Sequence, residues 1–145
     1  MEVALLQRWP ESFYMDTPGE KVAFLYGHWG VPMRQCKVLR TIYQSNHPGR
    51  RFTVTEIVEG VNDLPAKYAK DQYGIGRTQW IAAVNRGSLL GVAHTHPWRF
   101  GGRPSRNDLE GLPEGLLGVV VSGIEHREAF YIGKSTRHRL QDLVE

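Results

Sequence analysis

Residues 88–97 read Ser88-Leu89-Leu90-Gly91-Val92-Ala93-His94-Thr95-His96-Pro97. The apolar start of this run predicts a buried strand that delivers two histidines at its end. Alternate residues of an extended strand share a face, so His94 and His96 can aim both imidazoles at one point. After an intervening loop the chain reaches Ser105 and then Asp108. Catalytic zinc sites use three protein ligands and keep a fourth position for water. The spacing therefore predicts a zinc site formed by His94, His96 and Asp108.

Ser105 and Asp108 also fit a structural pattern. A serine followed three positions later by an acidic residue is typical of a capping box at a helix N-terminus. We therefore expect a short helix over Ser105–Gly111. The two roles are compatible, because the first turn of a helix is a rigid platform for a metal ligand.

The rest of the chain predicts strands interspersed with short helices. Besides the strand at Ser88–Ala93, strands are expected at Val22–Tyr26, Lys37–Tyr43, Phe52–Val58, Leu116–Ser122 and Glu128–Ile132. Helical segments are expected at Thr78–Arg86, ended by Gly87, and at Arg137–Glu145. This order is typical of an α/β or α+β layer fold in a single domain over residues 1–145.

Three further expectations concern how these segments are arranged. Lys37–Tyr43 is predicted to be the hairpin partner of Val22–Tyr26, because turn-forming residues lie between them. Glu59–Gly76 is polar and rich in glycine, which indicates an irregular insertion with at most a short helix. In the helix at Thr78–Arg86, the expected apolar face consists of Trp80, Ile81 and Val84.

Composition favours a soluble protein of a reducing compartment. The chain has 145 residues, of which 41% are hydrophobic and 23% charged, and it has no apolar run long enough for a membrane span. Met1–Pro10 lacks the features of a secretory signal. The single cysteine, Cys36, excludes an internal disulfide, and cytoplasmic location is expected. Cys36 itself is either an idle thiol or a nucleophile.

The charge pattern does not favour nucleic acid as a partner. The net charge is +3, and the basic residues are spread along the chain rather than gathered in a stripe. Arg99, Arg103 and Arg106 do lie close to the histidines in sequence. They form either a solvated loop or a cationic lip for a substrate.

A zinc hydrolase needs two groups besides its ligands. A base takes the proton from water and returns it to the leaving amine, and a glutamate that is not a ligand suits this role. A hydroxyl beside the metal, here Ser105, can stabilise the oxyanion of a tetrahedral intermediate.

At this point the pattern resembles a known family. The run His94-x-His96-Pro97-x₇-Ser105-x₂-Asp108 resembles the signature of the JAMM (MPN-plus, JAB-type) zinc metallo-isopeptidases, and the chain looks most like their small bacterial members. In that family a glutamate precedes a short apolar strand ending in glycine. Residues 18–27 resemble this element, which implies that Glu20 is the general base. Only nineteen residues precede Glu20, so the family's preceding helix is expected to be shortened or absent; Glu11, Glu56 and Glu59 are fallback bases.

The resemblance, over roughly residues 17–132, implies a fold and an activity. The fold is a JAB/MPN domain, a curved mixed sheet flanked by helices and similar to cytidine deaminases. The activity is zinc-dependent hydrolysis, with one Zn²⁺ per chain, of isopeptide or peptide bonds after the tail of a ubiquitin-like protein. Deconjugation and precursor processing both fit, in a bacterial ubiquitin-like conjugation or antiviral pathway. Trp98 and Arg99 would border the cleft and contact substrate, although a structural loop fits them equally.

Three other functions remain open. One is release of an amino acid from the C-terminus of a sulfur-carrier protein. Another is a RadC-like role associated with DNA repair, since that group shares a similar run ending in Pro104-Ser105-x-x-Asp108. The third is an inactive scaffold of the same fold, although such members usually lose ligands that this chain retains.

Overall fold

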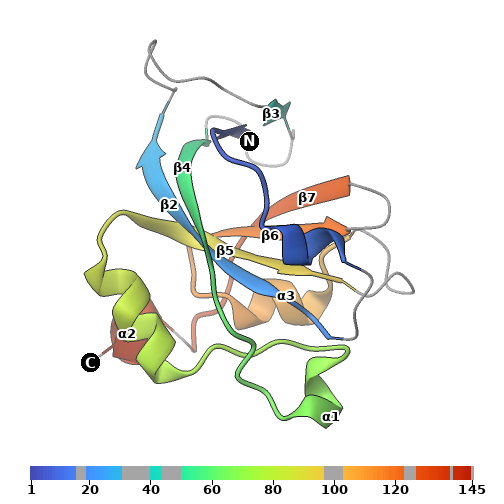
Figure 1. The fold of residues 1–145 in the computed structure, drawn as a ribbon. Helices are drawn as coiled ribbons and strands as arrows, with labels where there is room; N and C mark the ends of the chain where they lie inside the picture. The colour runs from blue at the N-terminus through green and yellow to red at the C-terminus, as the bar shows by residue number, and fades with distance from the viewer. Residues whose placement is uncertain are drawn as a thin grey trace.

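The centre of the molecule is a mixed seven-stranded sheet in the order β3-β1-β4-β2-β5-β6-β7 (Figure 1). The computed structural model describes residues 1–15, 19–30, 40–43, 50–96, 103–122, 127–137 and 139–144. The strands are β1 (Glu2–Leu5), β2 (Val22–Trp29), β3 (Arg40–Tyr43), β4 (Arg51–Glu59), β5 (Leu89–Thr95), β6 (Leu117–Ser122) and β7 (Arg127–Ile132). The helical elements are the 3-10 helix η1 (Glu11–Tyr14) and the helices α1 (Ala66–Ala69), α2 (Arg77–Asn85), α3 (Arg106–Gly111) and α4 (Leu140–Val144).

Strand β5, which leads to the two histidines, is an interior strand of this sheet and the fifth in that order. It pairs with β2 in the antiparallel sense and with β6 in the parallel sense. Gly91 lies opposite Leu117 in the parallel pair, and a Cβ on Gly91 would lie 1.7 Å from the Leu117 carbonyl oxygen. Only glycine allows the two strands to approach so closely.

Successive side chains of a strand point to opposite faces of the sheet, so the central strands contribute residues to two apolar clusters. Ala93 of β5 belongs to the first cluster, together with Trp9 and Phe13, whose rings stack with centroids 5.8 Å apart. Val92 belongs to the second cluster, together with Trp80 of α2. His94 follows Val92 by two residues and therefore lies on the face of the second cluster.

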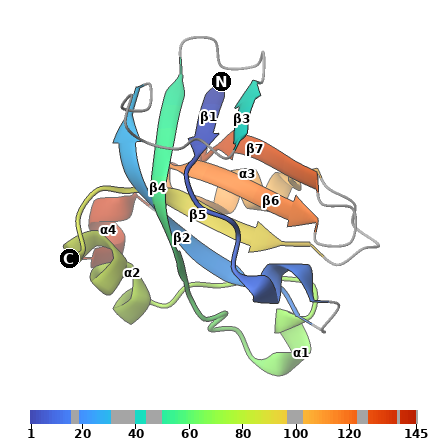
Figure 2. The same cartoon turned by 45° about the horizontal axis from the view of Figure 1, so that its top comes forward.

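Different helices pack on the two faces of the sheet. Figures 1 and 2 both show η1 on one face and α3 on the other. Helices α2 and α4 pack against one another, and Trp80, Ala83 and Leu140 join the second cluster. No helix within the described ranges is long and apolar enough to cross a membrane.

Most of the expected elements are confirmed. Strands β2, β4, β5, β6 and β7 lie at or close to the positions expected from the sequence. Residues 59–76 contain only the short helix α1, and Gly87 follows α2 with a φ of 85°, as expected of a residue that ends a helix. The coarse class, a mixed sheet with few helices, is also confirmed. The prediction of the apolar face of α2 was only partly right. Trp80 and Ala83 are buried, whereas Ile81 and Val84 are half-buried.

The expected hairpin was wrong. Strand β3 pairs with β1, and the neighbours of β2 are β4 and β5. The sequence analysis missed β1, which inserts between β3 and β4 by pairing with both. Before Glu20, the described residues contain β1 and the short η1 and no longer helix. Cys36 lies outside the described residues.

Candidate metal centre

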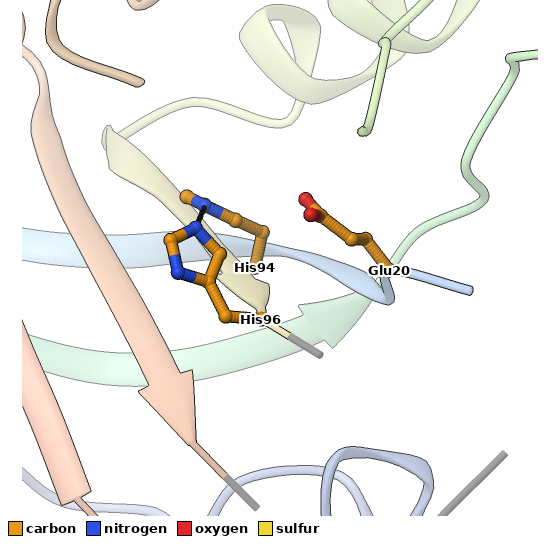
Figure 3. Close-up of side chains that lie close together, drawn as sticks. All are labelled: Glu20, His94 and His96. Carbon is orange, nitrogen blue, oxygen red and sulfur yellow. Dashed lines mark hydrogen bonds between the residues drawn. The ribbon is translucent and has the colours of Figure 1, made fainter. Parts of the chain in front are cut away.

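The two histidines lie at the end of β5, where the strand leaves the sheet. His94 is fully buried between Val22 of β2 and Val120 of β6, its neighbours in the strand register. His96 follows the last strand residue, and its backbone N–H donates to the Val121 carbonyl oxygen at 3.3 Å. Both rings point to the same side of the strand (Figure 3), as the alternation of residues predicts.

The ring nitrogens meet a carboxylate from α3. The Nε2 atoms of His94 and His96 lie 3.1 Å apart. Asp108 Oδ2 lies 3.0 Å from His96 Nε2, and Asp108 Oδ1 lies 3.2 Å from His94 Nε2. The structure therefore brings all three predicted ligands together at one point.

While Asp108 is charged, every placement of hydrogen atoms on the two Nε2 atoms leaves one unfavourable contact in this arrangement. Burial opposes ionisation of Asp108, but hydrogen bonds from His94 and His96 hold its pKa well below the usual range, so the carboxylate is charged. If both Nε2 atoms carry a hydrogen directed toward the Asp108 carboxylate, the two N–H groups also face and repel each other. If one Nε2 lacks hydrogen, its lone pair faces a carboxylate oxygen.

A cation at the centre of the three groups removes the conflict, because it accepts a lone pair from each. Burial is the main cause that lowers the pKa of His94, which favours the neutral imidazole that metals bind. Bonds of the length typical of zinc place tetrahedral ligand atoms about 3.3 Å apart, close to the separations of the three donors. The residues present therefore fit a small divalent ion.

Asp108 is held in place within the first turn of α3. Ser105 is the N-cap residue of α3, and its Oγ accepts a hydrogen bond from the Asp108 N–H at 3.1 Å. Asp108 Oδ2 in turn accepts from the Ser105 N–H at 2.8 Å. The predicted capping box is thus present, and the same carboxylate faces the histidines.

Glu20 lies across a gap from the histidine pair. Its carboxylate, His94 and His96 each offer a ligand atom within 4.8 Å of the others, a group able to hold a metal ion. Figure 3 shows the Glu20 side chain pointing toward the histidines from a position two residues before β2. Burial raises the pKa of Glu20 to about 7, a shift that His96 opposes and Asp108 supports. At neutral pH this carboxyl group is therefore able both to take up and to release a proton.

Thr95, the residue between the histidines, aligns Glu20 with them. The Lys21 N–H donates to Thr95 Oγ1 at 2.8 Å, and the Thr95 N–H donates to the Lys21 carbonyl oxygen at 3.0 Å. The sequence analysis gave Thr95 no role. Strand pairing between β2 and β5 is the signal that would have identified it, since the pair places Val22 opposite His94.

Tyr73 is a further site residue that the sequence analysis missed. Its ring stacks on the His94 imidazole, with centroids 4.3 Å apart and an interplanar angle of 28°. Burial raises the pKa of its phenol, so the hydroxyl remains protonated at neutral pH. Tyr73 comes from the irregular insertion, where no periodic pattern marks the residues that pack against the site.

A cavity of about 780 Å³ opens over these groups. Glu20, His96 and Asp108 lie in its lining, with Ser105 and Arg103 on the side of α3 and Tyr73 on the side of the insertion. Its remaining lining residues are Asp71, Gln72, Gly74, Ile75, Trp80, Pro104, Asn107, Gly111 and Leu112.

The predicted substrate contacts and the predicted cationic lip lie only partly within the described residues. Trp98 and Arg99, the expected substrate contacts, lie outside the described residues, as does the Arg99 part of the cationic lip. Arg106 is exposed and pairs with Glu110.

The fallback bases Glu11, Glu56 and Glu59 do not line the cavity. Glu56 pairs with Arg86, and Glu59 accepts a hydrogen bond from Ser12. Glu20 is therefore the glutamate that faces the histidines among the residues that the structure describes.

Comparison of the chain with models of protein families, with curated proteins and with solved structures gave no match.

Proposed function

We propose that the protein is a zinc-dependent peptidase or isopeptidase of the JAMM type. The observation that carries this proposal is the convergence of His94 Nε2, His96 Nε2 and the Asp108 carboxylate at 3.0–3.2 Å, with a buried glutamate across the gap. Three ligands, of which His96 and Asp108 line a cavity, with a titratable group beside them, are the parts that a hydrolytic metal site requires. A JAB/MPN domain is the fold proposed to carry them.

The three ligands would hold one Zn²⁺, which when bound supplies Lewis acidity and lowers the pKa of water to about 7. The Glu20 carboxylate would take a proton from the attacking water, whose oxygen bonds to the substrate carbonyl carbon. It would return this proton to the amine nitrogen as the bond between that nitrogen and the carbonyl carbon breaks. The raised pKa of Glu20, about 7, matches both directions of this transfer at neutral pH. Thr95 keeps the adjacent backbone in register with the ligands.

Ser105 is proposed to donate a hydrogen bond to the substrate oxyanion. Its Oγ accepts from the Asp108 N–H, which leaves the hydroxyl hydrogen able to rotate toward the cavity. The same contact fixes the oxygen within the first turn of α3. A donor that is already in place needs no reorganisation when charge develops on the substrate.

The proposed substrate is the extended C-terminal tail of a ubiquitin-like protein joined to a lysine or to a further peptide. The cavity has space for several residues of such a tail, and residues of the segment 71–75 belong to its lining. An extended tail offers backbone donors and acceptors that can hydrogen bond to polar groups of a cleft. Deconjugation and precursor processing require the same chemistry at the metal.

The test combines metal analysis with product analysis. We expect the purified protein to carry about one zinc per chain, and Glu20→Gln to keep the zinc but lose cleavage by about 100-fold or more. Mass spectrometry would follow a ubiquitin-like precursor, a lysine conjugate and a sulfur-carrier adduct in parallel. Cleavage of the sulfur-carrier adduct alone would favour the alternative substrate.

Glu59→Gln is the matched control, because this exposed glutamate hydrogen bonds to Ser12 and does not line the cavity. We expect it to leave cleavage unchanged. Full activity of Glu20→Gln would rule out the assigned base. A protein that cannot be loaded with zinc would favour the scaffold function instead.

A further inference from the structure

Asn62 lies at the start of the irregular insertion, three residues after the end of β4, and its side chain makes five hydrogen bonds. Its Nδ2 donates to the carbonyl oxygens of Glu20 at 3.1 Å, Ala69 at 3.4 Å and Gln72 at 2.9 Å. Its Oδ1 accepts from the N–H groups of Leu64 at 3.2 Å and Gly74 at 3.1 Å. One half-buried amide thus joins five backbone groups from two parts of the chain.

The orientation of this amide follows from its partners. Three carbonyl oxygens surround one end and two N–H groups face the other, so the reversed orientation would set oxygen against oxygen and N–H against N–H. The contacts therefore require an asparagine, whose side chain is a donor at one end and an acceptor at the other.

These contacts attach the insertion to the backbone of Glu20. The Glu20 N–H donates to the Ala69 carbonyl oxygen at 2.7 Å, and the Glu20 carbonyl oxygen accepts from Asn62. Both backbone polar groups of Glu20 are therefore bound to the insertion. Thr95 fixes the next residue, Lys21, from the opposite side.

The same amide also fixes the part of the insertion that covers His94. Gln72 and Gly74, both bonded to Asn62, flank Tyr73 on either side. Tyr73 stacks on the His94 ring at 4.3 Å. One side chain thus connects the glutamate to the aromatic ring that holds a histidine in place.

We propose that Asn62 is a positioning residue, which holds Glu20 and Tyr73 in register with the histidine pair. The catalytic part of this role rests on the proposed function; the structural part does not. Asn62 acts through Glu20 and Tyr73 and does not line the cavity itself.

A second set of hydrogen bonds in the insertion offers a control. Gln79 Nε2 donates to the Val61 carbonyl oxygen and to Asp63 Oδ2, each at 2.6 Å, and Gln79 Oε1 accepts from the Val61 N–H at 2.9 Å. These bonds hold the residues on either side of Asn62 and involve no group of Glu20. Gln79→Ala therefore removes hydrogen bonds from the same segment but keeps the Asn62 side chain that contacts Glu20.

The first experiment measures amide hydrogen exchange by NMR on the full chain, freed of metal, and needs no activity. Asn62→Asp keeps the size of the side chain and its acceptor end, but sets a carboxylate oxygen against three carbonyl oxygens. We expect Asn62→Asp and Asn62→Ala to accelerate exchange of the Glu20 amide about tenfold or more, with the Val119 amide of β6 unchanged. Gln79→Ala should leave the Glu20 amide at its wild-type rate.

The second experiment measures cleavage of a ubiquitin-like precursor by the zinc-loaded proteins. Displacement of a base by about 1 Å is enough to lower kcat by tenfold to a hundredfold. We expect that loss in both Asn62 variants, with zinc content and KM unchanged, and a kcat within about twofold of wild type in Gln79→Ala.

The outcomes separate this inference from the proposed function. Unchanged exchange of the Glu20 amide in both Asn62 variants overturns the inference, as does faster exchange with an unchanged kcat. A wild type that cleaves no such precursor refutes the proposed function. In that case the exchange rate of the Glu20 amide alone decides whether Asn62 holds this segment.

Discussion

Two carboxylates near the same histidines have opposite electrostatic environments. The pKa of Asp108 lies well below its usual range because the histidines donate to it, despite the opposing effect of burial. Burial raises the pKa of Glu20 to about 7, and Asp108 adds to the effect. One group is therefore a permanent anion suited to a cation, and the other is poised to exchange a proton.

The raised pKa of Glu20 makes the metal-free protein less stable as the pH rises. Below about pH 4.5 the carboxyl group is protonated in the folded and unfolded states alike. Between about pH 4.5 and 7 the unfolded chain loses the proton while the folded chain keeps it. The folded state binds more protons in this window, so its stability falls as pH increases.

We therefore expect Glu20→Gln to become progressively more stabilising as the pH rises. Relative to wild type, its free energy of unfolding should increase by at most about 3 kcal/mol between about pH 4.5 and pH 8, and by less where water enters the cavity. Urea unfolding of chelator-treated protein at several pH values measures this. Glu59→Gln should retain the wild-type pH dependence; a Glu20→Gln curve parallel to wild type would show that Glu20 is not buried as described.

At the scale of elements, the site depends on how closely β5 approaches its neighbours. Gly91 permits the approach of β6, because a Cβ there would meet the Leu117 carbonyl oxygen at 1.7 Å. Separating these strands would shift His94, three residues further along β5. The close approach of β5 and β6 at Gly91 therefore affects both the stability of the sheet and the position of His94.

Gly91→Ala should therefore cost about 3 kcal/mol or more of unfolding free energy. Gly111, at the end of α3, is the matched control, because a Cβ there has no atom within 4 Å among the residues described. Denaturant unfolding of the two variants would compare them directly. A Gly91→Ala protein as stable as Gly111→Ala would contradict the close strand pairing.

Local sequence patterns could predict the strands but not all of their partners. The run from Leu89 to Thr95 has a clear apolar character, and its alternation placed His94 and His96 on one side. The pairing of β3 with β1 could not be predicted, since a four-residue strand with three buried residues has no alternating pattern. Asn62 and Tyr73 belong to an irregular segment, where contacts depend on tertiary folding alone.

At the scale of the whole molecule, the proposed ligands come from two elements that the fold must bring together. His94 belongs to β5 and His96 directly follows this strand, whereas Asp108 belongs to α3, and an unfolded chain would hold these groups at no fixed distance. A metal ion that binds the three together therefore binds the folded state in preference. The stability of the protein should then depend on the free zinc concentration.

We expect zinc at 100 times its dissociation constant to add about 2.7 kcal/mol to the free energy of unfolding and to raise Tm accordingly. Two variants separate the ligand role of Asp108 from its role in the helix cap. Asp108→Asn keeps an oxygen that can accept from the Ser105 N–H but loses the charge, so it should lose the zinc-dependent rise in Tm. Ser105→Ala loses the cap, at a cost of about 1 kcal/mol, but should keep that rise. Differential scanning calorimetry with and without zinc measures both quantities. If Asp108→Asn showed the full zinc-dependent rise in Tm, the charge of Asp108 would not be needed to bind the metal. The role of this side chain would then be limited to the helix cap, which the variant preserves.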